Sequence, residues 1–200
     1  NAGTYKLVFT GTGSYTGEIV KTIHVTRDLS SLDITTDSEQ MYTGSAITPE
    51  IIVREADTEK RLKAGTDYKI NYQDQSGQAI TEIKNIGNYK VVVKGIGDYT
   101  GSKELSVHVV RSVEDLNISL TESHDYTGSA IDPQLSVTEP ETGNKLRKDT
   151  DYTVIYKDAA GEAVTAIQEA GSYTVVIKGT GDYTGEVTRT IYVIRPGDIS

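Results

Sequence analysis

The sequence predicts an all-β fold made of tandem immunoglobulin-like β-sandwich domains. Two observations carry this prediction. The chain repeats itself with a period of 84 residues, and its apolar stretches alternate with polar residues at the period of a β-strand. Turn-forming residues separate these stretches about every eight to twelve positions, which is typical of a sandwich rather than of a helical protein.

The repeat is clearest in a run that occurs three times, beginning at Tyr5, Tyr89 and Tyr173: YKLVFTGTGSYTG, YKVVVKGIGDYTG and YTVVIKGTGDYTG. We therefore predict one complete immunoglobulin-like repeat over 28–111 and a second over 112–195. Residues 1–27 match only the end of a repeat, so they are expected to be the C-terminal hairpin of a truncated one. Residues 196–200 are expected to start a further linker or tail, and the chain to be a fragment of a longer protein.

Each repeat is expected to consist of short strands. In the first repeat the strand-like segments are LDIT (32–35), ITPEIIV (47–53), DYKINYQ (67–73), AITEI (79–83), YKVVVKG (89–95) and LSVHVV (105–110). The segment DTEKRLKAG (57–65) could form one turn of helix. Its counterpart ETGNKLRKD (141–149) is instead typical of a hairpin turn.

Two kinds of tyrosine recur in the thirteen-residue run. The first follows a small residue and a glycine, in AGTY, IGNY and AGSY. Immunoglobulin-like domains place a tyrosine at the start of strand F, where its hydroxyl bonds back to the chain in a tyrosine corner. Structural roles are therefore predicted for Tyr5, Tyr89 and Tyr173. The run then continues into GxGDYTG, a glycine-rich hairpin turn.

The order of these motifs resembles that of the MBG-type bacterial immunoglobulin-like repeats. It runs Tyr-Thr-Gly-x-x-Ile-x-Pro, Asp-Tyr-x-Val/Ile-x-Tyr, Ala-Gly-x-Tyr-x-Val and Gly-x-Gly-x-Tyr-x-Gly, and it covers residues 1–195. The resemblance implies a non-catalytic stalk or spacer in a cell-surface or secreted protein, chiefly of Gram-positive bacteria, that presents an adhesive or carbohydrate-active module. It implies an extracellular location and, as partners, other domains of the same larger protein. A host or polysaccharide ligand would then be bound through neighbouring modules.

Composition excludes several classes of partner. The net charge of −9 and the acidic isoelectric point argue against nucleic acid and against an anionic membrane surface, both of which attract basic proteins. No apolar run approaches the length of a membrane span, so no membrane insertion is expected. The chain has no cysteine, which excludes disulfides, zinc–thiolate sites and a cysteine nucleophile.

No catalytic residue and no cofactor-binding residue are predicted. His24 and His108 occupy the same repeat position, but Tyr192 occupies it in the last repeat. A catalytic base would not be exchanged for tyrosine between copies. His124 likewise corresponds to Gln40.

No metal site is predicted either. The turn aspartates Asp98 and Asp182 could ligate calcium, but Ser14 takes their place in the first hairpin, and the spacing of a calcium loop is absent. An intramolecular isopeptide bond is disfavoured because Lys94 alternates outward between valines and corresponds to Thr10.

The alternative function is that of a carbohydrate-binding module for glycan or starch. Its weak candidate residues are the exposed loop tyrosines expected at the glycine-rich turn, Tyr15, Tyr99 and Tyr183, because aromatic rings stack on sugars. The chain has no tryptophan, the residue that stacks best. The competing interpretation is that each of these rings packs over its own hairpin.

Residues 1–27 should present an open strand edge and a bare apolar face, formed by Tyr5, Leu7, Phe9, Ile23 and Val25. Such an edge is a template for pairing with another strand. A strand-pairing contact through 1–27 is therefore expected, with the following domain or, as we favour, with another molecule.

Overall fold

The protein is described here by a computed structural model in which residues 2–197 are placed. The chain divides into two compact units, Asn1–His108 and Val109–Ser200. The second unit thus begins three residues before the predicted boundary at 111/112. Of the predicted tail at 196–200, residues 198–200 lie outside the described part.

The first unit begins with a β-hairpin. Its strands β1 (Gly3–Thr10) and β2 (Glu18–Val25) pair antiparallel from Gly3 opposite Val25 to Thr10 opposite Glu18, and they form a two-stranded sheet of their own. Both faces of this hairpin are exposed along nearly its whole length.

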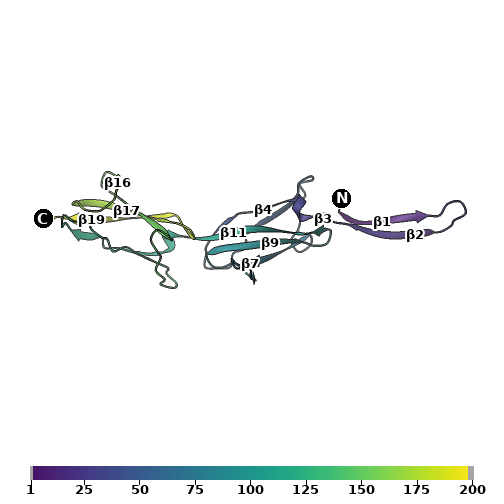
Figure 1. Ribbon diagram of the computed structural model, residues 1–200, viewed down its shortest axis with the longest axis horizontal. Coiled ribbons are helices and arrows are strands. Elements are labelled where there is room, and N and C mark those ends of the chain that lie inside the picture. Colours follow the sequence, from purple (N-terminus) through teal and green to yellow (C-terminus); the bar gives the residue numbers. More distant parts are fainter. Residues whose placement is uncertain (1, 198–200) are drawn as a thin grey trace. The chain divides into compact units, whose positions relative to one another are not determined.

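The rest of the first unit is an immunoglobulin-like β-sandwich (Figure 1). Its larger sheet has the order β11-β9-β7-β8, with β5 paired to β11; its smaller sheet is β4-β6, and the short strand β10 pairs with β3. The strand bounds are β3 Arg27–Asp28, β4 Leu32–Thr36, β5 Glu39–Met41, β6 Ile51–Glu55, β7 Tyr68–Gln73, β8 Ala79–Ile80, β9 Gly87–Gly95, β10 Tyr99–Thr100 and β11 Ser102–Ser112.

The second unit has the same plan. Its larger sheet has the order β13-β19-β17-β15-β16, its smaller sheet is β12-β14, and the short strand β18 pairs with the end of β11. The strand bounds are β12 Asn117–Ser119, β13 Ser123–Asp125, β14 Ser136–Thr138, β15 Tyr152–Lys157, β16 Ala163–Val164, β17 Gly171–Gly179, β18 Tyr183–Thr184 and β19 Glu186–Ile194.

Equivalent positions of the two repeats form the two cores. Alternate residues of β9 and β17 are fully buried, as expected for strands with one face in a sandwich core. Pairs of buried residues lie 84 positions apart: Leu29 and Val113, Val53 and Val137, Ile83 and Ile167, Val91 and Val175, and Val93 and Ile177. The periodicity that identified the repeat in the sequence is thus a periodicity of core positions.

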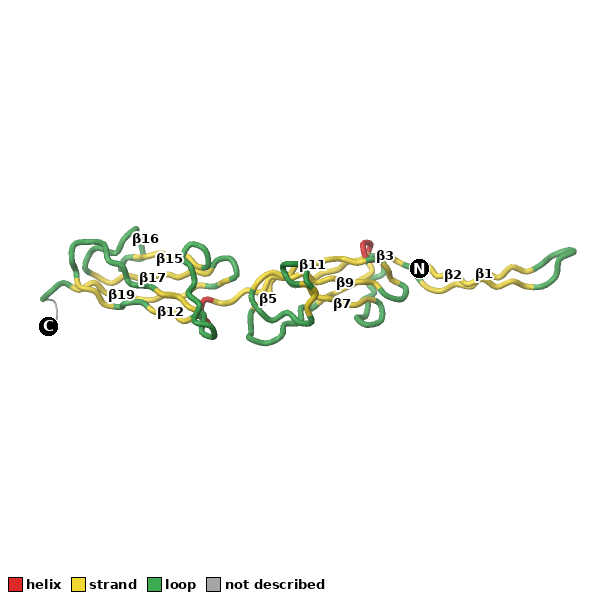
Figure 2. Tube along the Cα trace, turned by 60° about the horizontal axis from the view of Figure 1, so that its bottom comes forward, coloured by secondary structure: helices red, strands yellow, loops and turns green. Residues whose placement is uncertain are grey.

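Two short 3-10 helices, drawn in red in Figure 2, were not predicted from the sequence. They span Leu29–Ser31 and Val113–Asp115, and their N-caps Asp28 and Ser112 accept hydrogen bonds from the backbone two residues on. A helix of three residues is too short to show a periodic pattern. The single helical turn considered for 57–65 does not form, because Glu55 N donates to Lys60 O and closes a hairpin there.

Candidate functional site

The glycine-rich turn of the second unit folds tightly around Tyr183. A Cβ atom at Gly179 would lie 2.7 Å from the backbone carbon of Tyr183, so only glycine allows the chain to return this closely. Gly185 has a φ of +81°, a conformation that other residues rarely adopt. The two glycines therefore fix the turn in the shape that carries the tyrosine.

The chain that enters the second unit pairs with this turn. The last residues of β11 run parallel to β18, with Arg111 opposite Tyr183 and Ser112 opposite Thr184. Arg111 N donates to Asp182 O at 3.0 Å. Backbone pairing therefore holds the incoming strand against the turn, in addition to any side-chain contact.

The side chain of Arg111 then reaches the loop between β14 and β15. Its two terminal nitrogens donate to the two carboxylate oxygens of Glu141, each at 2.7 Å. This paired geometry is the strong form of an arginine–carboxylate interaction. Arg111 is only 6% exposed, whereas the carboxylate of Glu141 is half exposed. The hydrogen bonds from Arg111 hold the pKa of Glu141 below its ordinary value.

Tyr183 binds a second acidic residue of the same loop, Glu139. Its hydroxyl donates to Glu139 Oε1 at 2.9 Å, and Thr142 Oγ1 donates to the other carboxylate oxygen at 2.7 Å. The ring is 9% exposed. Burial, and then the hydrogen bond to Glu139, raise the pKa of the Tyr183 hydroxyl well above its ordinary value. We call this set of an arginine, a tyrosine and two acidic residues the clasp.

The first unit contains the same clasp 84 positions earlier. Arg27 N donates to Asp98 O at 2.9 Å, and its guanidinium donates to both carboxylate oxygens of Asp57 at 2.9 and 3.1 Å. Tyr99 donates to Glu55 at 2.7 Å. Hydrogen bonds from Thr58 and Tyr99 lower the pKa of Glu55. The clasp is thus built twice, with Asp57 in the place of Glu141.

The clasp corrects the prediction of exposed loop tyrosines. Tyr99 and Tyr183 are 4% and 9% exposed, so their rings offer no surface for a sugar to stack on. They are buried because the incoming strand and an acidic residue close over the turn, which the sequence pattern of a single hairpin cannot show. Tyr15, the equivalent residue of the first hairpin, is 80% exposed. Among the described residues no strand pairs with its turn.

The three tyrosines with predicted structural roles lie at the starts of β1, β9 and β17. Tyr89 donates to Asn85 O at 2.9 Å, and Tyr173 donates to Glu169 O at 3.0 Å, four residues upstream in each case. This is the geometry of a tyrosine corner. Tyr173 is buried and Tyr89 half-buried, whereas Tyr5 is exposed.

Other residues considered in the sequence do not assemble into a chemical centre. His24 Nε2 lies 2.7 Å from Asp98 Oδ1 on the surface, and His124 Nε2 lies 3.0 Å from Thr121 O. Within residues 2–197, acidic and histidine side chains nowhere gather in threes as a metal site requires. None of the helices placed there is long and apolar enough to cross a membrane.

Sequence reasoning missed the acidic half of the clasp. Glu55 and Glu139 occupy the same repeat position, as do Thr58 and Thr142 and the linker arginines. The rule that identified the tyrosines as structural, recurrence at one repeat position, applies equally to these residues. Surface acids and a linker arginine are usually solvated, so residue type alone does not mark them as structural.

Comparison with known proteins gives little beyond the fold. No protein-family model matches the chain, and no curated protein matches it. It is similar to the crystal structure of Dpr2 Ig1-Ig2 in complex with DIP-Theta Ig1-Ig3, at 11% identity and a TM-score of 0.31, over 82% of this chain and 65% of that chain.

Two further solved structures are similar. One is Bacteroides ovatus mixed-linkage glucan utilization locus SGBP-B in complex with mixed-linkage heptasaccharide. The identity is 11% and the TM-score is 0.24, and the match covers 98% of this chain and 71% of that chain. The other is protocadherin gamma B7 extracellular cadherin domains 1-4, at 10% identity, 92% and 56% coverage, and a TM-score of 0.24. The chain thus spans 65% of the first of the three similar structures and 56% of the last.

Proposed function

We propose that the chain is a non-catalytic spacer of tandem immunoglobulin-like repeats in a bacterial surface or secreted protein, of the MBG type. The observation that supports this most is the clasp, which is built in both units on the strand that enters the unit. A ligand site need not sit on an incoming strand, whereas a spacer must control how each repeat is joined to the chain before it.

The clasp bears on this function because it leaves little free linker. The residues that would otherwise be flexible, Arg111 and Ser112, are already paired with β18, and Val113 is buried as the first residue of a 3-10 helix. Flexible linkers are rich in glycine and serine and make no such contacts. In a spacer, a short hydrogen-bonded junction would let the length of the array increase with each added repeat.

Small-angle X-ray scattering tests the spacer directly. We expect an extended particle in which each complete repeat adds about 35–40 Å, from strands of six or seven residues and their turns. Inserting five Gly/Ser residues between Val110 and Arg111 is the matched control, and it should broaden the distribution of interatomic distances. Two repeats lying side by side in the unaltered chain would contradict the proposal.

The proposed location is extracellular, and the proposed partners are neighbouring domains of the same larger protein. With the tyrosines of the complete turns buried, no affinity for starch or other neutral polysaccharides is expected from those turns. A host ligand or a neutral polysaccharide would then be bound by modules outside the two repeats.

We propose further that the hairpin β1–β2 makes a strand-pairing contact. Its apolar side chains are exposed on both faces, and they are Tyr5, Leu7, Val8, Phe9, Ile19, Val20, Ile23 and Val25. A two-stranded hairpin is marginal alone in water, and its unpaired edges favour association with further strands. Its partner would be another strand-bearing chain.

Removing residues 1–25 tests this contact and keeps Arg27 for the clasp of the first unit. We expect both repeats to unfold at unchanged temperatures and any self-association seen by light scattering to disappear. Phe9→Lys, which leaves the hairpin in place, should also reduce self-association. Unfolding of the first repeat on removal of the hairpin would show instead that these strands complete its core.

A further inference from the structure

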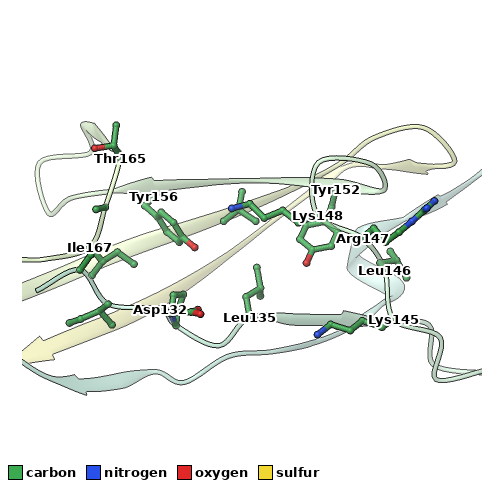
Figure 3. A pocket seen from close by; sticks show the side chains of 15 residues that line it. Asp132, Leu135, Lys145, Leu146, Arg147, Lys148, Tyr152, Tyr156, Thr165 and Ile167 are labelled. Atoms are coloured by element: carbon green, nitrogen blue, oxygen red, sulfur yellow. The ribbon is translucent and has the colours of Figure 1, made fainter.

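The second unit contains an open groove whose lining includes none of the clasp residues. It has a volume of about 800 Å³ and lies between β15 and the non-strand segment 130–135. Tyr152, Val154 and Tyr156 of β15 form one wall, and Leu135 and Ile167 lie across from them. Figure 3 shows Tyr152 and Tyr156 on one side of the groove and Leu135 and Ile167 on the other.

The groove opens here because the smaller sheet is shorter than in the first unit. There, β6 pairs with β4 over five residues and begins at Ile51, which is 6% exposed. The counterpart β14 pairs with β12 over three residues. Leu135, at the position of Ile51, falls before β14 and is half-buried. Its neighbour Gln134 has a φ of +54°, which turns the chain away from the strand path.

The groove residues of the second repeat differ in charge from the corresponding residues of the first repeat. At the residues that line the groove and at position 134, the second repeat loses two carboxylates, gains one lysine and gains one aspartate, so these positions together are more positive by two charges than in the first repeat. The exchanged pairs are Glu50 and Gln134, Ala64 and Lys148, Glu82 and Ala166, and Thr48 and Asp132. The change is notable in a chain whose net charge is −9.

The lysines of the groove lack acidic partners. In the first repeat Arg61 binds Glu50 at 3.0 Å, but in the second the corresponding Lys145 has Gln134 at that position. Among residues 2–197, neither Lys145 nor Lys148 forms an ion pair with a carboxylate, whereas Arg147 lies 3.7 Å from Asp151. Lys145 and Lys148 both line the groove, and Figure 3 shows Lys148 near β15 and Lys145 along the opposite wall.

We propose that this groove binds an acidic polysaccharide whose sugars carry carboxylates. The amines of Lys145 and Lys148 would meet two carboxylates of the chain, while Leu135 and Tyr156 would contact the apolar faces of the sugar rings. The wall opposite β15 is a non-strand segment, so the groove offers side-chain amines, hydroxyls and ring faces rather than a run of backbone groups. This combination suits a sugar chain better than an extended peptide.

The test uses the whole chain and fully de-esterified oligogalacturonate as the probe, with binding measured by isothermal titration calorimetry. The double variant Lys148→Ala, Ala166→Glu places the residues of the first repeat at two of the four exchanged positions. It should weaken binding by about tenfold or more, the effect of losing one charged hydrogen bond and adding repulsion. Binding should also weaken as salt is raised from 0.05 to about 0.3 M.

Three controls make the result decisive. Arg61→Gln with Lys63→Gln, which removes two positive charges at the positions of Lys145 and Arg147 in the first repeat, should leave the dissociation constant unchanged. Methyl-esterified oligogalacturonate, which is neutral, should not bind. The reverse exchange Ala64→Lys, Glu82→Ala should not weaken binding, and unchanged thermal unfolding of each variant shows that the fold is intact.

Absence of binding to the acidic probe, or equal binding by the Lys148→Ala, Ala166→Glu variant, would overturn the proposal. So would equal binding of the neutral ester. Binding of an oligoglutamate peptide that depends on Lys148, with no binding of the sugar, would replace the polysaccharide by an acidic peptide.

Discussion

Replacing Tyr183 with alanine is expected to lower the free energy of unfolding of the second repeat by about 3–5 kcal/mol, the cost of removing a large buried aromatic side chain. The ring is almost fully buried beneath the incoming strand, and its hydroxyl binds Glu139. Calorimetry should show one transition shifted to lower temperature and the transition of the first repeat unchanged. Tyr15→Ala, at the same motif position but 80% exposed, is the matched control and should have little effect.

Tyr183→Phe separates the ring from its hydroxyl. Loss of one hydrogen bond should cost about 0.5–1.5 kcal/mol, because Glu139 keeps its bond from Thr142. The pKa of Tyr183 is raised in the folded state, so the hydroxyl contributes stability below its unfolded pKa of about 10, and this is lost as the pH rises above that value. The phenylalanine variant should therefore show less alkaline destabilisation. If Tyr183→Ala were as stable as the wild type, a structural role for Tyr183 would be refuted.

The fold was predictable because core positions recur. Val91 and Val93 match Val175 and Ile177 in sequence and in burial, so the sequence periodicity and the packing carry the same information. The tyrosine of AGSY was predictable for the same reason, since a local motif determines its hydrogen bond to Glu169. Local pattern and one repeated core were sufficient for these features.

The clasp was not predictable from local pattern. Its members lie far apart in sequence, and Tyr183 is 44 residues from Glu139. An exposed turn tyrosine and a buried one have nearly the same neighbours in sequence, since GTGSYTG around Tyr15 and GTGDYTG around Tyr183 differ only in Ser14 and Asp182. What distinguishes them is an incoming strand that pairs with the turn, and such a long-range pairing leaves no signal in the residues next to either tyrosine.

The groove was unpredictable for a different reason. It arises where the repeats differ, at a strand shortened to three residues and at four exchanged charges. A search for similarity between the repeats passes over such positions. In a repeat protein, shared positions report the fold, and positions that differ in charge beside an opening are where a particular repeat can acquire a ligand.

Replacing Arg111 with alanine is expected to destabilise the second repeat by about 2–4 kcal/mol, through the loss of a buried side chain and two charged hydrogen bonds. Arg111→Lys keeps the charge but not the paired geometry, so it should recover only part of this stability. The measurement is chemical denaturation of both variants and of Glu141→Gln. A double-mutant cycle should show that the effects of the Arg111 and Glu141 substitutions are not additive.

The pH dependence of this effect identifies its source. Arg111 lowers the pKa of Glu141 in the folded state, so the interaction contributes stability above the ordinary carboxyl pKa and loses it as the pH falls through the lowered value. The difference in stability between the wild type and Arg111→Ala should therefore narrow in acid. In scattering experiments Arg111→Ala should also broaden the distance distribution, as the Gly/Ser insertion does. A variant as stable as the wild type, with no coupling to Glu141 and an unchanged scattering profile, would mean that the backbone pairing of β11 with β18 holds the incoming strand alone.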